Sequence, residues 1–189
     1  MAGCRTLPDP CETPKEDPPT REESENRKVV REFIDRVWNA TWSKEDSNRL
    51  LAGRGSGDNT YVPPSVEDTL GSLRHPDSIR HRRDRAGNPI RSSGPDDYKK
   101  CVNAVHMIVQ DLRVEILDMV ASGDSVVVQM LLRGTDRRAD GKAELPGAFG
   151  AQPPTGKRFR MQTTSVYQLR DHRIISDRLM YGAPLEYED

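Results

Sequence analysis

The spacing of the apolar residues changes from a helical to a strand period near the middle of the chain. Residues 25–41 and about 95–109 carry apolar side chains at positions i, i+3, i+4 and i+7, which places them on one helix face. From residue 111 onward apolar and polar residues alternate, as in a strand with one buried face. Helices followed by a run of strands predict an α+β fold, with helices packed on one face of an antiparallel sheet.

Four strands are predicted in this second half, and they form a meander. The first begins near residue 111, and the second, 125–133, is almost entirely apolar, which is typical of a strand covered on parts of both faces. Two more strands, about 157–169 and 173–181, are joined by a short turn. A long loop, 134–156, separates the two pairs of strands.

The first half of the chain is less regular outside its two long helices. A short helix is predicted over 44–51, and 60–62 could form one turn of strand. Residues 65–93 are basic and carry little apolar period, so they are predicted to be irregular. The first 24 residues contain five prolines and a single leucine, and they are expected to form a disordered tail before a domain over 25–189.

Charge and composition argue against several classes of partner. The formal net charge of −1 gives no reason to expect a nucleic acid or an anionic membrane. The basic cluster within 65–93 has no interleaved aromatic residues for base stacking, so a solvated loop is the simpler interpretation. No apolar run approaches the roughly 18 residues of a spanning helix. The three cysteines, Cys4, Cys11 and Cys101, are scattered and odd in number, which favours the reducing cytoplasm.

Four sequence segments occur in an order and spacing that is similar to a known family. They are V-V-R-E-F-I-D-R-V-W-N (29–39), G-P-D-D-Y-K-K (94–100), the strand pair that opens with Q-D-L-R-V-E-I (110–116), and P-P-T-G-K-R (153–158) with its closing hairpin. Over roughly 26–62 and 94–182 the chain resembles the SnoaL-like polyketide cyclases of the nuclear transport factor 2-like superfamily.

This resemblance implies a cone-shaped, curled antiparallel sheet with helices on its concave face and a cavity between them. It also implies general acid–base chemistry without a metal or cofactor, on a polycyclic or otherwise reactive small hydrophobic molecule. A homodimer formed through the outer face of the sheet is a further implication. Residues 65–93 look like an insertion relative to a short loop of the family, and they could close over the cavity as a lid.

Two motifs depart from the family pattern. The family reads Glu-His-Trp-Asp on its last hairpin, where this chain has Ser176-Asp177-Arg178-Leu179. The family's Tyr-Val-x-His near the cavity mouth reads Tyr61-Val62-Pro63-Pro64. The catalytic groups have therefore either been rebuilt around Asp177 or been lost.

The pairing of the last two strands decides whether Asp177 or Arg178 enters the cavity. A two-residue loop at Asp171-His172 places Asp177 opposite Val166 on one face of the sheet, together with a pair between Thr164 and Leu179. Arg178 then points to the other face. A loop one residue longer would exchange the two assignments.

The predicted catalytic residues follow from these positions. Asp177 would transfer a proton, because burial in an apolar cavity raises the pKa of a carboxylic acid toward neutrality. Tyr61 and Arg178 would stabilise charge that develops on a substrate oxygen. His75, in the possible lid, is a further acid–base candidate. The residues predicted to line the cavity are Phe33, Trp38, Tyr98, Met130, Thr164, Leu179 and Tyr181.

We therefore predict a cofactor-independent cyclase or isomerase of natural-product biosynthesis. One alternative is a hydrolase or dehydratase in which Asp177 activates a water in the same cavity. The other alternative is a ligand-binding or interaction module without catalysis, which the altered Glu-His-Trp-Asp motif would favour. A filled cone with a solvated Asp177 would indicate the module, and a cavity with a buried carboxylate would indicate an enzyme.

Overall fold

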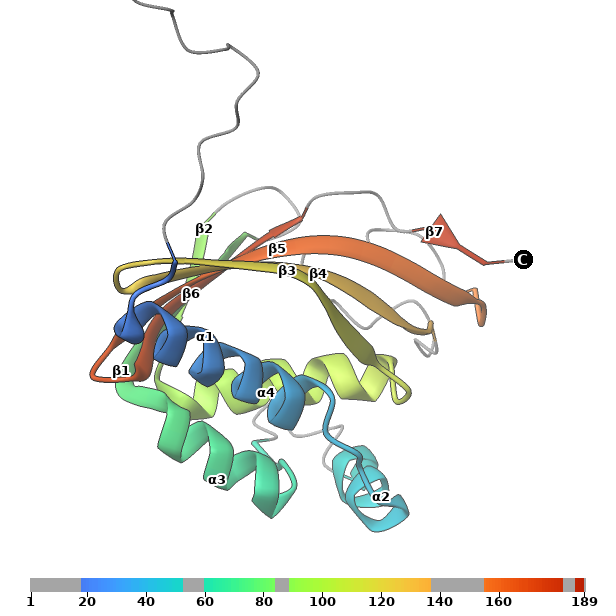
Figure 1. The fold of residues 1–189 in the computed structure, drawn as a ribbon. Coiled ribbons are helices and arrows are strands. Elements are labelled where there is room, and N and C mark those ends of the chain that lie inside the picture. Colours follow the sequence, from blue (N-terminus) through green and yellow to red (C-terminus); the bar gives the residue numbers. More distant parts are fainter. Residues whose placement is uncertain (1–17, 53–59, 84–88, 137–154, 182–185, 189) are drawn as a thin grey trace, which may run out of the picture.

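The computed structural model of the chain describes residues 18–52, 60–83, 89–136, 155–181 and 186–188. In these residues the helices pack on one side of a single curved sheet (Figure 1). The helices are α1 (Arg21–Phe33), the π-helical turn η1 (Ile34–Trp38), α2 (Lys44–Ala52), α3 (Pro64–Leu73) and α4 (Gly94–Ile108). The strands are β1 (Arg74–Arg83), β2 (Pro89–Ser93), β3 (Arg113–Ser122), β4 (Ser125–Thr135), β5 (Arg158–Arg170), β6 (Arg173–Tyr181) and β7 (Glu186–Tyr187).

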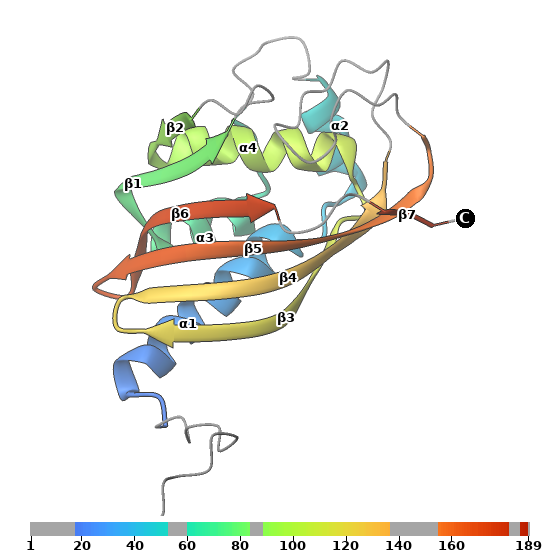
Figure 2. The same ribbon diagram turned by 90° about the horizontal axis from the view of Figure 1, so that it is seen from above.

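The sheet is curled but not closed. Its strand order is β2-β1-β6-β5-β4-β3, and β7 pairs with β5 beside this path (Figure 2). The predicted antiparallel meander of four strands, β3 to β6, is confirmed. The expectation of a purely antiparallel sheet is wrong at one pair of strands, because β1 pairs with β6 in parallel.

Residues 65–93 are not an irregular lid. Their described part, 65–83 and 89–93, forms most of α3 and the strands β1 and β2, which extend the sheet beyond β6. Residues 84–88 lie outside the described residues. The reason that the prediction failed is chemical. The buried side chains of β1 are Arg74, Ser78 and Arg80, so the strand carries no apolar alternation to reveal it.

The first helix begins earlier than predicted, at Arg21. Its N-cap is Thr20, whose hydroxyl accepts a hydrogen bond from the backbone N–H of Glu23 (3.2 Å). The Glu23 carboxylate in turn accepts one from the backbone N–H of Thr20 (2.8 Å), which completes a capping box. Of the expected tail, residues 1–17 lie outside the described residues.

Side-chain hydrogen bonds near both ends of the first helix hold it against the sheet. Near its start, the Asn26 side chain donates to the carbonyl of Gly123 in the β3–β4 turn (3.1 Å). Just after η1, the Asn39 side chain bonds both backbone groups of Val114 on β3, at 2.9 and 2.7 Å. Phe33, Ile34 and Val37 are thereby fully buried against the concave face.

The outer face of the sheet carries the exposed large apolar residues. They are Leu117, Val120, Val127 and Met180. The homodimer through this face stays a prediction. Among the described residues, no helix is both long and apolar enough to cross a bilayer.

Gly134 on β4 offers a test of the packing between the sheet and the end of α4. A Cβ at this position would overlap with Cγ1 of the buried Val109. We expect Gly134→Ala to lower the free energy of unfolding by about 1–3 kcal/mol, as other overpacked cores do. Urea denaturation measures this change.

Gly71 on α3 is the matched control, because nothing lies within 4 Å of a Cβ added there. Gly71→Ala should raise stability by about 0.5–1 kcal/mol, since alanine is the better helix former. Equal stability of the two variants would contradict the packing described.

Candidate functional site

A bulge in β6 decides which side chains reach the concave face. The turn has the expected two residues, and both have positive φ, 49° for Asp171 and 56° for His172. Leu169 pairs with Ile174 as predicted, but Gln168 then pairs with Ser176, which leaves Ile175 as an extra residue. Beyond this point the pairing is shifted by one residue.

The shifted register overturns the predicted pairs of Asp177 and Leu179. Asp177 lies opposite Tyr167 rather than Val166, and Leu179 lies opposite Ser165 rather than Thr164. Since Tyr167 and Ser165 are both buried on the concave side, Asp177 faces inward with them.

Two predicted site residues lie on the other face of the sheet. Thr164 pairs with the exposed Met180, and Arg178 is exposed beside Val166. The neighbours of Thr164 on β5, Thr163 and Ser165, are the residues that face the concave side. Arg178 therefore cannot reach a group on the concave side.

The concave face and the helices enclose a cavity of about 80 Å³. Its polar wall is formed by Arg80, Tyr98, Thr163, Ser165, Tyr167 and Asp177. Its apolar wall is formed by Val105, Leu112, Val114, Met130, Leu132 and Leu179, and Trp38 also lines it. The structure thus brings together five predicted residues, Trp38, Tyr98, Met130, Asp177 and Leu179.

The remaining predicted residues lie elsewhere. Phe33 is buried behind the cavity, where its ring packs edge-on against Tyr98, with centroids 5.5 Å apart. The Tyr61 hydroxyl donates to the carboxylate of Asp46 on α2, away from the cavity lining. His75 is the second residue of β1 and is half-buried, and its Nδ1 accepts a hydrogen bond from the backbone N–H of Asp77 (3.2 Å). The side chain of Tyr181 lies outside the described part of the chain.

Asp177 sits between two buried arginines that the sequence argument did not include. Its Oδ1 lies 2.7 Å from Nη1 of Arg74, and its Oδ2 lies 3.7 Å from Nε of Arg80. Asp177, Arg74 and Arg80 are 4%, 2% and 8% exposed. The Nε of Arg74 also donates to the hydroxyl of Ser78 (3.2 Å). The surroundings of Asp177 are therefore ionic and not the apolar ones expected.

Aromatic rings support both guanidinium groups. The guanidinium carbon of Arg74 lies 4.0 Å from the centroid of the Tyr98 ring, and that of Arg80 lies 4.8 Å from it. Arg80 is also 5.7 Å from the centroid of Trp38. Such cation–π contacts favour a desolvated guanidinium without using its hydrogen-bond donors.

Protonation states in the cavity follow from burial and from neighbouring charge. Burial opposes the charged form of Arg80, but the titratable groups around it, Cys101, Tyr98 and Asp177, outweigh burial and raise the pKa of Arg80 above its usual value. Burial also raises the pKa of Tyr98 and of Tyr167. At neutral pH both phenols are therefore uncharged hydrogen-bond donors.

Several polar atoms of the cavity have no hydrogen-bond partner among the described residues. They are Nε and Nη1 of Arg80, Oγ1 of Thr163 and Oδ1 of Asp177. The 2.7 Å contact of Asp177 with Arg74 is an ion pair without hydrogen-bond alignment. Because most buried polar groups in proteins are paired, this cluster marks a place where a polar ligand can bind.

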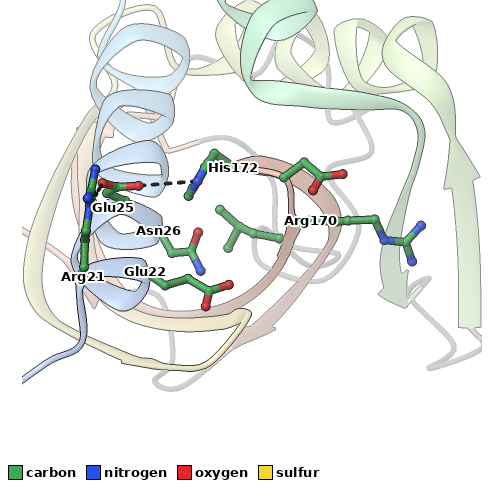
Figure 3. Close-up of a pocket in the computed structure, with 8 residues that line it drawn as sticks. Arg21, Glu22, Glu25, Asn26, Arg170 and His172 are labelled. Carbon is green, nitrogen blue, oxygen red and sulfur yellow. Dashed lines mark hydrogen bonds and ion pairs between the residues drawn. The ribbon is translucent and has the colours of Figure 1, made fainter.

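A second hollow is larger but is chemically less suited to catalysis. It measures about 370 Å³ and lies between the start of α1 and the β5–β6 turn (Figure 3). Its lining includes Arg21, Glu22, Glu25, Arg170 and His172, and the His172 Nε2 lies 3.4 Å from a carboxylate oxygen of Glu25. The side chains of this pair are 53% and 36% exposed, so water screens them. We therefore take the smaller, buried cavity as the candidate site.

Metal binding finds no support in the described residues. They contain no group of three or more His, Cys, Asp or Glu side chains that could hold an ion.

The sequence matches a protein family that is consistent with the fold described above. A family model described as SnoaL-like polyketide cyclase matches residues 65–182, which includes the segment that we expected to be an insertion. No curated protein sequence matches the chain significantly.

Three solved structures share the architecture. A protein from Jannaschia sp. CCS1 assigned as a SnoaL-like polyketide cyclase has a TM-score of 0.59 at 18% identity, over 87% of this chain and 90% of that chain. An NTF2-like protein from Anabaena variabilis ATCC 29413 has a TM-score of 0.53 at 12% identity, over 87% and 94%. An LEH-like epoxide hydrolase from M. tuberculosis has a TM-score of 0.50 at 16% identity, over 87% and 83%. The expected curled-sheet fold is therefore confirmed.

His106 on α4 gives a pH-dependent test of the packing next to this site. It is 3% exposed and its ring stacks on Trp42, with centroids 4.7 Å apart. Burial, helped by the charge of Arg113, lowers the pKa of His106 from 6.5 to about 4. Between these two pH values the unfolded chain binds a proton that the folded chain does not, so stability is lost as the pH falls.

We expect the free energy of unfolding to drop by up to about 3 kcal/mol between pH 6.5 and pH 4 through this histidine. Urea denaturation across this range measures the drop. His106→Gln should flatten the dependence, whereas His172→Asn, at an exposed turn, should keep it. An unchanged slope in His106→Gln would show that another group is responsible.

Proposed function

Because the chain belongs to the SnoaL-like polyketide cyclase family, we propose that it is a cofactor-independent cyclase or isomerase that transfers protons on a small oxygenated molecule. The observation that supports this most is the position of Asp177. It is a buried carboxylate at the wall of a cavity, beside donors that lack a partner among the described residues.

The proposed first step is removal of a proton from a carbon next to a substrate carbonyl. The Asp177 carboxylate accepts this proton, and the C–H electron pair moves onto the carbonyl oxygen. Arg80 and the hydroxyl of Thr163 are the donors that can stabilise the charge developing there. Arg74 keeps Asp177 in one orientation through the 2.7 Å ion pair.

The proton then returns from Asp177, and its destination defines the reaction. Return to a different carbon completes an isomerisation. Attack of the enolate carbon on a second carbonyl of the same substrate forms a ring, and the new alkoxide takes the proton. Both outcomes use the same base, so the residues alone support either reaction.

The size of the cavity favours a smaller substrate than the polycyclic molecules expected from the resemblance. Sites for drug-sized ligands occupy about 300–1,000 Å³, whereas this cavity measures about 80 Å³. A compact substrate fits without movement of the wall. A cavity of this size would also hold a compact substrate near its reactive conformation.

An epoxide hydrolase is the second candidate. One neighbour in fold is an LEH-like epoxide hydrolase, and the cavity combines a carboxylate with the neutral phenols of Tyr98 and Tyr167. Asp177 would take a proton from the attacking water, and a phenol would donate to the epoxide oxygen. Turnover of an epoxide in ¹⁸O water distinguishes this candidate, because hydrolysis places the label in a diol product.

Replacement of the carboxylate tests the proposal. In D₂O, the enzyme should exchange the protons beside the carbonyl of small ketones, which ¹H NMR follows. Asp177→Asn should reduce the exchange rate by about 10²–10⁴-fold, the contribution of a positioned base.

Asp171→Asn is the control, because Asp171 is an exposed turn residue with positive φ, which asparagine adopts readily. It should retain the wild-type rate, and circular dichroism should show that both variants are folded. Unchanged exchange in Asp177→Asn would rule out this base. Absence of both proton exchange in the small ketones and label incorporation from epoxides would favour a binding module.

A further inference from the structure

The cluster around Asp177 carries an excess of positive charge. Arg74, Arg80 and Asp177 are each more than nine-tenths buried, and they contribute two cations and one anion. The phenols of Tyr98 and Tyr167, which also lie beside Arg80, add no charge at neutral pH, because burial raises their pKa. A buried charge without a counter-ion is unfavourable, so this cluster favours a bound anion.

The excess lies on Arg80 rather than on Arg74. Asp177 approaches Arg74 to 2.7 Å but Arg80 only to 3.7 Å, and Arg74 has a second partner in Ser78. Nε and Nη1 of Arg80 have no acceptor within the described part of the chain. The rings of Tyr98 and Trp38 cover Arg80 but offer its N–H groups no acceptor in the ring plane.

The cavity is polar at one end and apolar at the other. Arg80, Asp177 and Tyr167 share one row across β1, β6 and β5. Further along the strands, Thr163 pairs with Met130 on β4. Beyond this pair the inward residues are Leu132 and Val114, which face each other across β4 and β3. A ligand would thus place a charged group at Arg80 and an apolar group at Leu132.

We propose that the ligand of this cavity is a short-chain monocarboxylate, whose carboxylate is bound by Arg80. A guanidinium group matches the planar geometry of a carboxylate and can donate two parallel hydrogen bonds. The volume of about 80 Å³ corresponds to roughly six water-sized groups, which suits an acid of four or five carbons. This inference rests on the proposed function only in taking this cavity as the substrate site.

The test compares butanoate with butanamide, which has nearly the same shape but no charge. Both are titrated into the full-length protein, and binding is followed by ¹H–¹⁵N chemical-shift changes of Arg80, Thr163 and their neighbours. Butanamide should bind about 10- to 100-fold more weakly, which is the factor expected for hydrogen bonds to a charged group. Equal binding of the two compounds, or no binding of butanoate, would overturn the proposal.

Two variants with the same change in net charge locate the binding site. Arg80→Gln should weaken butanoate binding by about 10- to 100-fold, whereas Arg178→Gln, on the outer face, should leave it unchanged. Should Arg80→Gln fail to fold, Arg80→Lys provides the second variant: it keeps the cation but removes the planar fork, and it should weaken butanoate binding more than butanamide binding. Equal loss in Arg80→Gln and Arg178→Gln would indicate non-specific attraction and would refute the site.

The outcome is separable from that of the proposed function. Binding of butanoate that depends on Arg80, without exchange activity on any substrate, would support the carboxylate site and refute the enzyme. Exchange on neutral ketones without binding of butanoate would support the enzyme and refute the carboxylate site.

Discussion

The ion pair between Arg74 on β1 and Asp177 on β6 is the interaction on which the inner face of this sheet depends. Both groups are almost completely removed from water, and the loss of hydration is offset only while each has a partner. Removing either partner from such a pair typically costs about 3–5 kcal/mol, because the other charge is left buried alone. The pair therefore constrains how β1 lies against β6, and it constrains where the cavity can place a proton acceptor.

The remaining polar wall can be understood from this pair. Asp177 on β6 pairs with Arg80 on one neighbouring strand, β1, and with Tyr167 on the other, β5. The three residues therefore form one row across the sheet. The ring of Tyr98, supplied by α4, lies over both guanidinium groups. The two buried guanidinium groups are thus stabilised by aromatic faces and by a single carboxylate. The result is a cavity with a cationic end and a neutral, apolar end.

The sequence predicted the parts of the fold that have an apolar period. The helices now called α1 and α4 and the meander from β3 to β6 have such a period, and their existence was predicted correctly. The strand β1 could not be found in this way, because its inward residues are two arginines and a serine, and the partners of the arginines come from elements distant along the chain, such as β6 and α4. Local patterns carry no information about a partner so distant along the chain.

The candidate site was predicted only in part, because some of its residues lie on the strand that the sequence did not reveal. Trp38, Tyr98, Met130 and Leu179 were found from helical and strand positions, but Arg74 and Arg80 were missed together with their strand. The bulge at Ile175 moved Asp177 onto the inner face by a different pairing from the one expected. A single extra residue leaves no trace in composition, although it reverses which side chains of a strand face inward.

The parallel pairing of β1 with β6 has a consequence for how the protein reaches its folded state. β1 precedes the whole meander in the chain, whereas β6 is its last strand. Arg74 and Arg80 can form their ion pairs with Asp177 only when β6 lies beside β1. Contacts between such distant segments form slowly, because a long loop must close first. The polar wall of the cavity therefore depends on a pairing that closes the long loop between β1 and β6.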